Sequence, residues 1–195
     1  MTGGNIFFDL SELESLGQDS IIGRTVRIRK PKLCSIGHHT ILDDFTYVSC
    51  CITVGDYTHI GASGVMIGGN AHISIGDFVN IAPGCRLIAA SNDFSGGGLV
   101  GPAIPPAYAA PSIIGNITLE DHVLLGTNTV VLPGVHVPEG VSTGAMTLLT
   151  ADMKLEPWTL YVGAPARPLR CRDSAQILAT AARLRSENKS GPFRE

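Results

Sequence analysis

Aliphatic residues recur at every sixth position along much of this chain. Between residues 119 and 137 the repeating positions are Leu119, Leu125, Val131 and Val137. A six-residue period matches neither the 3.6-residue period of an α-helix nor the two-residue alternation of a strand. It indicates a three-sided coil in which each aliphatic side chain points to the axis and successive turns pair as short parallel strands. The pattern therefore predicts an all-β solenoid, a parallel β-helix built from hexapeptide repeats.

The extent of the period sets the expected boundaries of the coil. We expect it over residues 22–90 and 113–152, with a three-residue slip near residues 68–74 that indicates a bulge at a corner. Residues 91–112 (SNDFSGGGLVGPAIPPAYAAPS) show no period and are dense in glycine and proline. Long loops of this kind are uncommon and are usually functional or disordered. Because coil flanks this loop on both sides, we expect an active-site loop that leaves the prism.

Two helices are expected at the ends of the coil. Residues 9–16 (DLSELESL) have spaced leucines, and Ser11 and Glu14 stand at the spacing of a capping box. This short N-terminal helix would cover the open end of the stack, as repeat arrays require. Residues 173–188 have helical apolar spacing, and Asp173 or Ser174 is suited to cap the helix. The whole chain, 1–195, is thus expected to form a single domain.

Charge and cysteine content exclude several classes of function. The net charge of −3 and the pI of about 6.0 give no basic footprint for nucleic acid. No apolar run approaches the roughly 20 residues that cross a bilayer, and the N-terminus lacks the order of a signal peptide. The five cysteines have no CxxC spacing, so neither a disulfide framework nor a metal site is indicated. We expect a cytoplasmic protein without a metal, a nucleic-acid partner or a membrane partner.

Motifs in the C-terminal half resemble those of the hexapeptide-repeat acyltransferases. They are LLGTN, VLPGV, GAMTLLTAD and GAPARPLR, all within residues 124–170. The likeness is greatest to the galactoside and xenobiotic acetyltransferases and to the sugar-nucleotide N-acyltransferases. This resemblance implies a left-handed coil, acetyl-CoA as co-substrate, and a homotrimer with active sites between its subunits.

One residue departs from the family pattern. In galactoside-type enzymes a catalytic histidine stands two residues after the glycine of the corresponding turn, and here that position holds Asn128. A sugar hydroxyl needs a well-placed base such as histidine, whereas a free amine is already a good nucleophile. The substitution favours transfer of an acetyl or short acyl group to the amino group of an amino sugar, most simply a nucleotide-linked one. O-acetylation of a saccharide hydroxyl is the alternative.

The resemblance and the chemistry together nominate the site residues. Asp93, in the loop, is a candidate for a base or an acceptor-orienting group; otherwise it is a turn residue. His122, one hexapeptide before Asn128, is the second catalytic candidate; otherwise it is a surface histidine. Asn92 and Asn128 are expected to contact the sugar. The residues expected to contact the coenzyme, through backbone N–H groups or charge, are Gly126, Gly144, Ala145, Ala164, Arg167 and Arg170. For Trp158, packing against the terminal helix is favoured over stacking on adenine.

Two other classes of function are compatible with a hexapeptide coil. The γ-class carbonic anhydrases hold zinc with two histidines about five residues apart and a third from a neighbouring subunit. No histidine pair in this chain has that spacing. A non-catalytic scaffold would explain the missing histidine at Asn128, but the long loop and the intact GAPARP segment argue against it.

Overall fold

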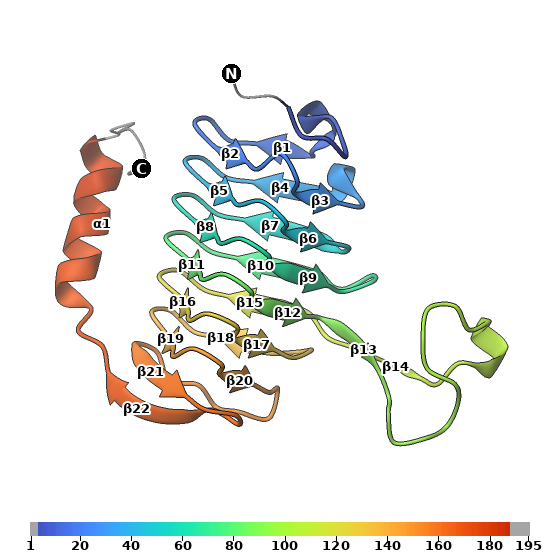
Figure 1. Ribbon diagram of the computed structural model, residues 1–195. Helices are drawn as coiled ribbons and strands as arrows, with labels where there is room; N and C mark the ends of the chain where they lie inside the picture. The colour runs from blue at the N-terminus through green and yellow to red at the C-terminus, as the bar shows by residue number, and fades with distance from the viewer. Residues whose placement is uncertain (1–3, 188–195) are drawn as a thin grey trace.

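In the computed structural model, which describes residues 4–187, the chain winds into a three-sided prism whose sides are sheets of short parallel strands (Figure 1). The first sheet contains β1 (Ser15–Leu16), β4 (Cys34–Ile36), β7 (Cys51–Val54), β10 (His72–Ile75), β15 (Ile117–Leu119) and β18 (His136–Val137). The second contains β2 (Ile21–Ile22), β5 (Ile41–Leu42), β8 (His59–Ile60), β11 (Asn80–Ile81), β16 (Leu124–Leu125), β19 (Ser142–Thr143), β21 (Thr159–Val162) and the antiparallel β22 (Arg167–Cys171). The third contains β3 (Arg27–Ile28), β6 (Tyr47–Val48), β9 (Val65–Ile67), β12 (Arg86–Ile88), β17 (Val130–Val131) and β20 (Leu148–Leu149).

The core confirms the six-residue period. The side chains at the repeating positions point to the axis and are at most 2% exposed: Ile36, Leu42, Val48, Val54, Ile60, Met66, Ile75, Ile81, Leu87, Leu119, Leu125, Val131 and Val137. Burial of one Leu or Ile side chain contributes about 1.5–3 kcal/mol. A second buried row lies two residues before the first and includes threonines. In that row the hydroxyl of Thr58 donates to Gly76 O (2.9 Å) and that of Thr129 donates to Gly126 O (2.6 Å). The polar atoms of this row are therefore satisfied inside the coil.

Three corners join the sheets. Corner 1 leads from the first sheet to the second and includes residues 76–79 and 120–123. Corner 2 leads from the second sheet to the third and includes residues 126–129 and 144–147. Corner 3 leads back from the third sheet to the first. The predicted slip lies at corner 3, where Gly69 has φ 57° and Ala71 N–H donates to Gly68 O (2.7 Å). The slip is therefore a small bulge, as expected.

The excursion loop also leaves the prism at corner 3. It begins with β13 (Ala90–Asn92), which pairs antiparallel with β14 (Ser112–Ile114), and it carries a 3₁₀ turn, η3 (Pro106–Tyr108). Figure 1 shows the loop projecting away from the coil on the side opposite the C-terminal helix. The prediction of a loop over residues 91–112 is confirmed, and its stalk is a two-stranded ribbon.

The predicted N-terminal helix is wrong. Only a single 3₁₀ turn forms, η1 (Leu10–Glu12), and its capping box joins Asp9 to Glu12 instead of Ser11 to Glu14. Residues 15–16 instead become β1, because they pair with Ser35 and Ile36 on the exposed edge of the next turn. Leu13 enters the core at 8% exposure. Pairing with the coil edge thus outweighs helical propensity, and the coil starts before the predicted residue 22.

The C-terminal end of the coil also extends beyond its predicted limit, because β21 continues the second sheet past residue 152. The helix α1 (Ala175–Glu187) then runs back along corner 1 (Figure 1). Asp173 accepts a hydrogen bond from Ala175 N–H (3.0 Å), as predicted for its cap, and the predicted last residue, 188, lies outside the described residues. The remaining 3₁₀ turn is η2 (Pro31–Leu33). Within residues 4–187, no helix has the length and apolarity required to span a membrane.

Candidate active site

Corner 2 gathers most of the predicted coenzyme-binding residues. Gly126 and Gly144 stand one above the other in consecutive turns, and a Cβ added to Gly126 would lie 2.6 Å from the carbonyl carbon of Gly144. Only glycine fits at such a separation. Ala145 follows Gly144 on the surface, and Ala164 occupies the next turn of the same corner. The coil therefore stacks these positions into one exposed column.

The backbone N–H groups of both glycines at corner 2 already have partners inside the protein. Gly126 N–H donates to Thr143 Oγ1 (2.9 Å), and Gly144 N–H donates to Tyr161 O (2.8 Å). Within residues 4–187, the N–H groups of Thr127 and Ala145 have no hydrogen-bond partner, and both residues are exposed. The donors available to a ligand are therefore those that follow each glycine.

Asn128 lies on the same corner with its side chain exposed. Its backbone adopts φ 58°, a left-handed conformation that asparagine tolerates better than most residues, and its N–H donates to Pro83 O (3.1 Å). Its side chain lies over Gly84, where an added Cβ would be 2.2 Å from Asn128 Oδ1. Gly84 was missed in the sequence, although it occupies the same slot one turn earlier. It leaves room for the amide of Asn128.

Asp93 lies where the excursion loop leaves β13. Its Oδ1 accepts two hydrogen bonds from Ser95, one from the hydroxyl (2.5 Å) and one from the backbone N–H (2.8 Å). These bonds, the hydroxyl bond first, hold the pKa of Asp93 below its ordinary value of 3.8. The backbone N–H of Asp93 donates to Pro111 O (2.9 Å) across the base of the loop. Asp93 is therefore an ionised, accessible carboxylate with a fixed orientation.

Asn92 faces a pocket inside the loop itself. This pocket has a volume of about 540 Å³ and is lined by Asn92, Gly101, Pro102, Ile104, Pro106, Ala109, Ala110, Pro111 and Ser112. Such a volume suits a small organic group. The loop therefore has its own polar contact and apolar walls beside Asp93.

Asp93 and the column at corner 2 do not converge within one copy of the chain. The loop leaves at corner 3, and the width of the third sheet separates corner 3 from corner 2. In the same turn, residues 82–85 form corner 2, β12 crosses the third sheet, and the loop follows. A site that uses both the loop and the column requires a second copy.

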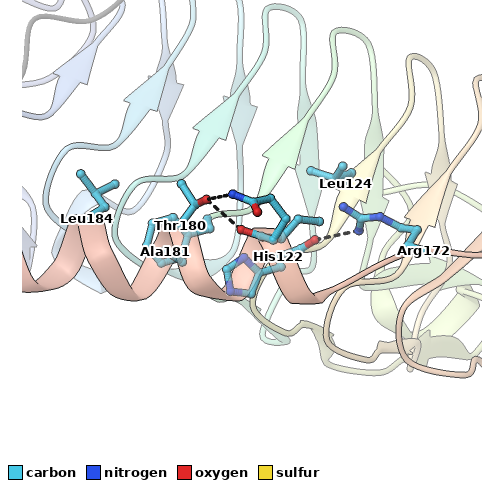
Figure 2. A pocket seen from close by; sticks show the side chains of 9 residues that line it. His122, Leu124, Arg172, Thr180, Ala181 and Leu184 are labelled. Carbon is cyan, nitrogen blue, oxygen red and sulfur yellow. Dashed lines mark hydrogen bonds between the residues drawn. The ribbon is translucent and has the colours of Figure 1, made fainter.

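His122 lies apart from both. It occupies corner 1 with φ 62° and is 5% exposed. Its ring stacks on Phe78 (centroids 5.1 Å apart, 2° between planes) and is tilted against Trp158 (5.7 Å). Its backbone carbonyl accepts a hydrogen bond from Arg172 (3.2 Å), beside α1 (Figure 2). This environment is a packed aromatic stack, in which Trp158 lies against His122 and Arg172.

Arg167 and Arg170 both project from β22. Both are exposed, and within residues 4–187 neither forms an ion pair. Arg167 lies just after corner 2, since Ala166 N–H donates to Leu148 O (3.0 Å) in the preceding turn. Arg167 thus stands near the column, whereas Arg170 lies opposite Leu160, further along the second sheet. In that same described part of the chain, no group of three or more His, Cys, Asp or Glu side chains is arranged to hold a metal ion.

Comparison with known proteins identifies close structural relatives. No protein-family profile matches the chain. The dTDP-4-amino-4,6-dideoxy-D-glucose acyltransferase of Escherichia coli is 29% identical over 172 residues, which cover 84% of this chain and 87% of that protein. AntD, an N-acyltransferase from Bacillus cereus solved with dTDP-4-amino-4,6-dideoxyglucose and coenzyme A, is 34% identical with a TM-score of 0.84, over 93% of this chain and 98% of its own.

A more distant solved structure shares the coil. The hexapeptide-repeat acetyltransferase VCA0836 of Vibrio cholerae, complexed with acetyl-coenzyme A, is 25% identical with a TM-score of 0.55, over 84% of this chain and 73% of its own. These structural neighbours are left-handed β-helices, which is the hand implied by the sequence resemblance.

Proposed function

Because the chain belongs to the left-handed β-helix, hexapeptide-repeat acyltransferases, we propose that it transfers an acetyl or short acyl group from coenzyme A to the amino group of a nucleotide-linked amino sugar. The observation that carries this proposal is the ionised carboxylate of Asp93 in the loop, together with Asn128 at the position where the sequence resemblance to galactoside-type enzymes implies a histidine. AntD was solved with a dTDP-linked 4-amino sugar, and the name of the Escherichia coli acyltransferase specifies one; both support a dTDP-linked acceptor.

The proposed reaction needs only a weak base. The amine nitrogen attacks the thioester carbonyl carbon, and the adduct carries an acidic ammonium group. Asp93 holds this ammonium group and accepts its proton, the C–S bond breaks, and the proton passes to the departing coenzyme A sulfur. A carboxylate of lowered pKa cannot deprotonate a hydroxyl efficiently, because the difference in pKa is too large. The chemistry of Asp93 therefore supports N-acylation over O-acylation.

The column at corner 2 supplies the remaining groups in this proposal. The N–H of Thr127 or of Ala145 stabilises the oxyanion of the adduct, a term that is often the largest in acyl transfer. Gly126, Gly144 and Ala164 allow the pantetheine arm to approach the backbone. Arg167 and Arg170 bind the coenzyme phosphates, and Asn92 and Asn128 contact the sugar. His122, buried in its stack, is assigned a packing role instead of a catalytic one.

We propose that the active unit is a homotrimer with its sites between copies. The loop exposes apolar side chains, including Phe94 (78% exposed) and Tyr108 (67%), while Met146 is exposed at corner 2 (67%). Apolar groups of this size exposed together mark interaction surfaces. A loop from one copy that lies against corner 2 of the next copy would bring Asp93 to the column. The cytoplasmic location expected from the sequence is retained as part of the proposal, and five free thiols suit a reducing compartment.

A thiol-release assay tests the proposed reaction. Purified protein is mixed with acetyl-CoA and, in turn, with dTDP- and UDP-linked 4-amino sugars and with the matching hydroxyl sugars. Release of coenzyme A is expected only with amino sugars, and mass spectrometry of the product should show one added acetyl group on nitrogen. Faster release with the hydroxyl sugars would overturn the proposal in favour of O-acetylation. The Cys171→Ser variant lowers the thiol background, because Cys171 is exposed.

A further inference from the structure

A pocket of about 370 Å³ lies between α1 and corner 1, apart from the column and the loop. Its walls are mainly apolar, and its lining residues are Phe78, His122, Leu124, Arg172, Gln176, Ile177, Thr180, Ala181 and Leu184. Figure 2 shows Arg172 at one end of the pocket and Leu184 at the other. A cavity of this volume is at the small end of the range for ligand pockets.

Arg172 is the charged group of this pocket. It is half-buried, and its removal from water lowers the pKa of its guanidinium group. Its Nη1 donates to the carbonyl oxygens of His122 (3.2 Å) and Gly140, and its guanidinium carbon lies 5.5 Å from the ring centroid of Trp158. Arg172 pairs with no carboxylate within residues 4–187. Partly buried charges usually have an ionic partner, so this cation is incompletely compensated.

At the far end of α1, in contrast to Arg172, the arginine has carboxylate partners. Arg185 pairs with Asp77 (2.5 Å) and lies 3.7 Å from Asp121, so these two carboxylates are engaged by that arginine. No Asp or Glu lines the pocket. The pocket therefore combines one uncompensated cation with an apolar floor formed by Leu124, Ile177 and Leu184.

We propose that this pocket binds a small monocarboxylate with an apolar body, such as a six-carbon acid. The carboxylate accepts charge-assisted hydrogen bonds from those N–H groups of Arg172 that do not donate to the two carbonyls. The apolar body lies between α1 and Leu124. This site does not depend on the acyl-transfer reaction, because neither Asp93 nor any residue of the column at corner 2 lines it.

The test follows Trp158, the only tryptophan, whose ring contacts Arg172. Hexanoate is titrated into the wild-type protein while tryptophan fluorescence is recorded, and calorimetry gives the stoichiometry. A saturable change with one site per chain is expected. Hexanol and acetate, each of which lacks one half of the proposed ligand, should bind at least tenfold more weakly. Equal binding of hexanol would overturn the role of Arg172.

Variants distinguish binding at this pocket from binding of hexanoate elsewhere on the protein. Arg172→Gln and Thr180→Phe, which remove the cation and fill the pocket, should each weaken hexanoate binding at least tenfold. Arg183→Gln, an exposed arginine of α1 outside the lining, is the matched control and should bind as the wild type. Circular dichroism and thermal melting verify that each variant is folded. If Arg172→Gln does not fold, Thr180→Phe still tests the pocket.

Two further results would contradict the proposal. Displacement of hexanoate by coenzyme A would place it in the acyl-transfer site. A change of oligomeric state in Thr180→Phe without any hexanoate binding to the wild type would show that another copy of the chain covers the pocket. The two proposals fail independently. The Asp93→Asn variant should bind hexanoate as the wild type does, so absence of acyl transfer would not count against the pocket.

Discussion

The hydroxyl of Ser95 donates a 2.5 Å hydrogen bond to Oδ1 of Asp93, and the backbone N–H of Ser95 donates a second one of 2.8 Å to the same oxygen. One carboxylate oxygen is thereby held in the turn, and Oδ2 has no hydrogen-bond partner within residues 4–187. The same Asp-x-Ser geometry recurs at Asp9, whose Oδ1 accepts from the N–H (2.9 Å) and hydroxyl (2.8 Å) of Ser11. The N-terminal pair therefore provides a matched structural control for the loop pair.

Replacing Asp93 tests its role as the group that holds and deprotonates the amine. We expect Asp93→Asn to lower kcat at least about tenfold, since an amide cannot accept the proton. Binding of coenzyme A, measured by calorimetry, should be unchanged. Asp9→Asn should retain the wild-type kcat. An unaffected rate in Asp93→Asn would remove this residue from the mechanism.

Replacing Ser95 tests whether it positions Asp93. We expect Ser95→Ala to lower kcat/KM roughly threefold to tenfold, the effect of one lost hydrogen bond, with partial recovery in Ser95→Thr and no loss in Ser11→Ala. Because the pKa of Asp93 lies below 3.8, the carboxylate is ionised at every pH above about 5. The rise of kcat/KM with pH should therefore follow the pKa of the substrate amine and should not move in Ser95→Ala. If the pH at which kcat/KM rises does not depend on the pKa of the substrate amine, the titrating group belongs to the enzyme instead.

The amide of Asn128 is expected to bind the sugar and not to take part in proton transfer. Asn128→Gly removes this side chain and tolerates φ 58°, whereas Asn128→Ala adds about 1 kcal/mol of backbone strain. Both variants should raise KM for the acceptor several-fold with kcat nearly unchanged, and only Asn128→Ala should also melt at a lower temperature. A large loss of kcat in Asn128→Gly would place the amide in the chemical step.

The packing of Trp158 depends on the absence of a side chain at Gly140. Gly140 has φ 67°, and an added Cβ would lie 2.2 Å from Trp158 Cδ2. Gly140→Ala is expected to displace the indole, shift its fluorescence to longer wavelength and lower the melting temperature. Gly69→Ala, which has a similar φ of 57° but open space around it, is the control for backbone strain alone. Equal effects of the two changes would show that strain, not the indole contact, is responsible.

The buried thiols should affect stability at alkaline pH. Burial raises the pKa of Cys34 to about 11 and that of Cys50 to about 12, from an ordinary value of 9.0. Below about pH 8 these thiols are protonated in the folded and unfolded states alike. As the pH rises above 9, the unfolded thiols ionise first, so the free energy of unfolding should fall. Urea unfolding from pH 8 to 10.5 measures this slope, and Cys50→Ala should make it shallower.

The path of the coil could be predicted from the sequence because its determinants are local. A buried aliphatic residue at every sixth position, such as Leu125 and Val131, fixes which side chains point to the axis regardless of distant contacts. The same regularity placed Gly126, Asn128 and Gly144 on one corner. The interruption of the period marked the loop that carries Asp93.

The failures of prediction came from contacts between residues far apart in the sequence. Residues 15–16 form a strand and not the end of a helix because Ser35 and Ile36 offer an open edge. His122 is buried and not a surface histidine because the rings of Phe78 and Trp158 pack against it. Neither contact leaves a trace in the hexapeptide period.

The sequence by itself determined the periodic coil, the position of the loop and the place of Asn128 in its turn, since each is a property of consecutive residues. The tertiary structure alone decided that His122 is enclosed by Phe78 and Trp158, and that Asp93 and Asn128 stand at different corners. The physical reason is that a period fixes the direction of a side chain within its own turn. Burial and proximity depend on which turns, helices and copies pack against it.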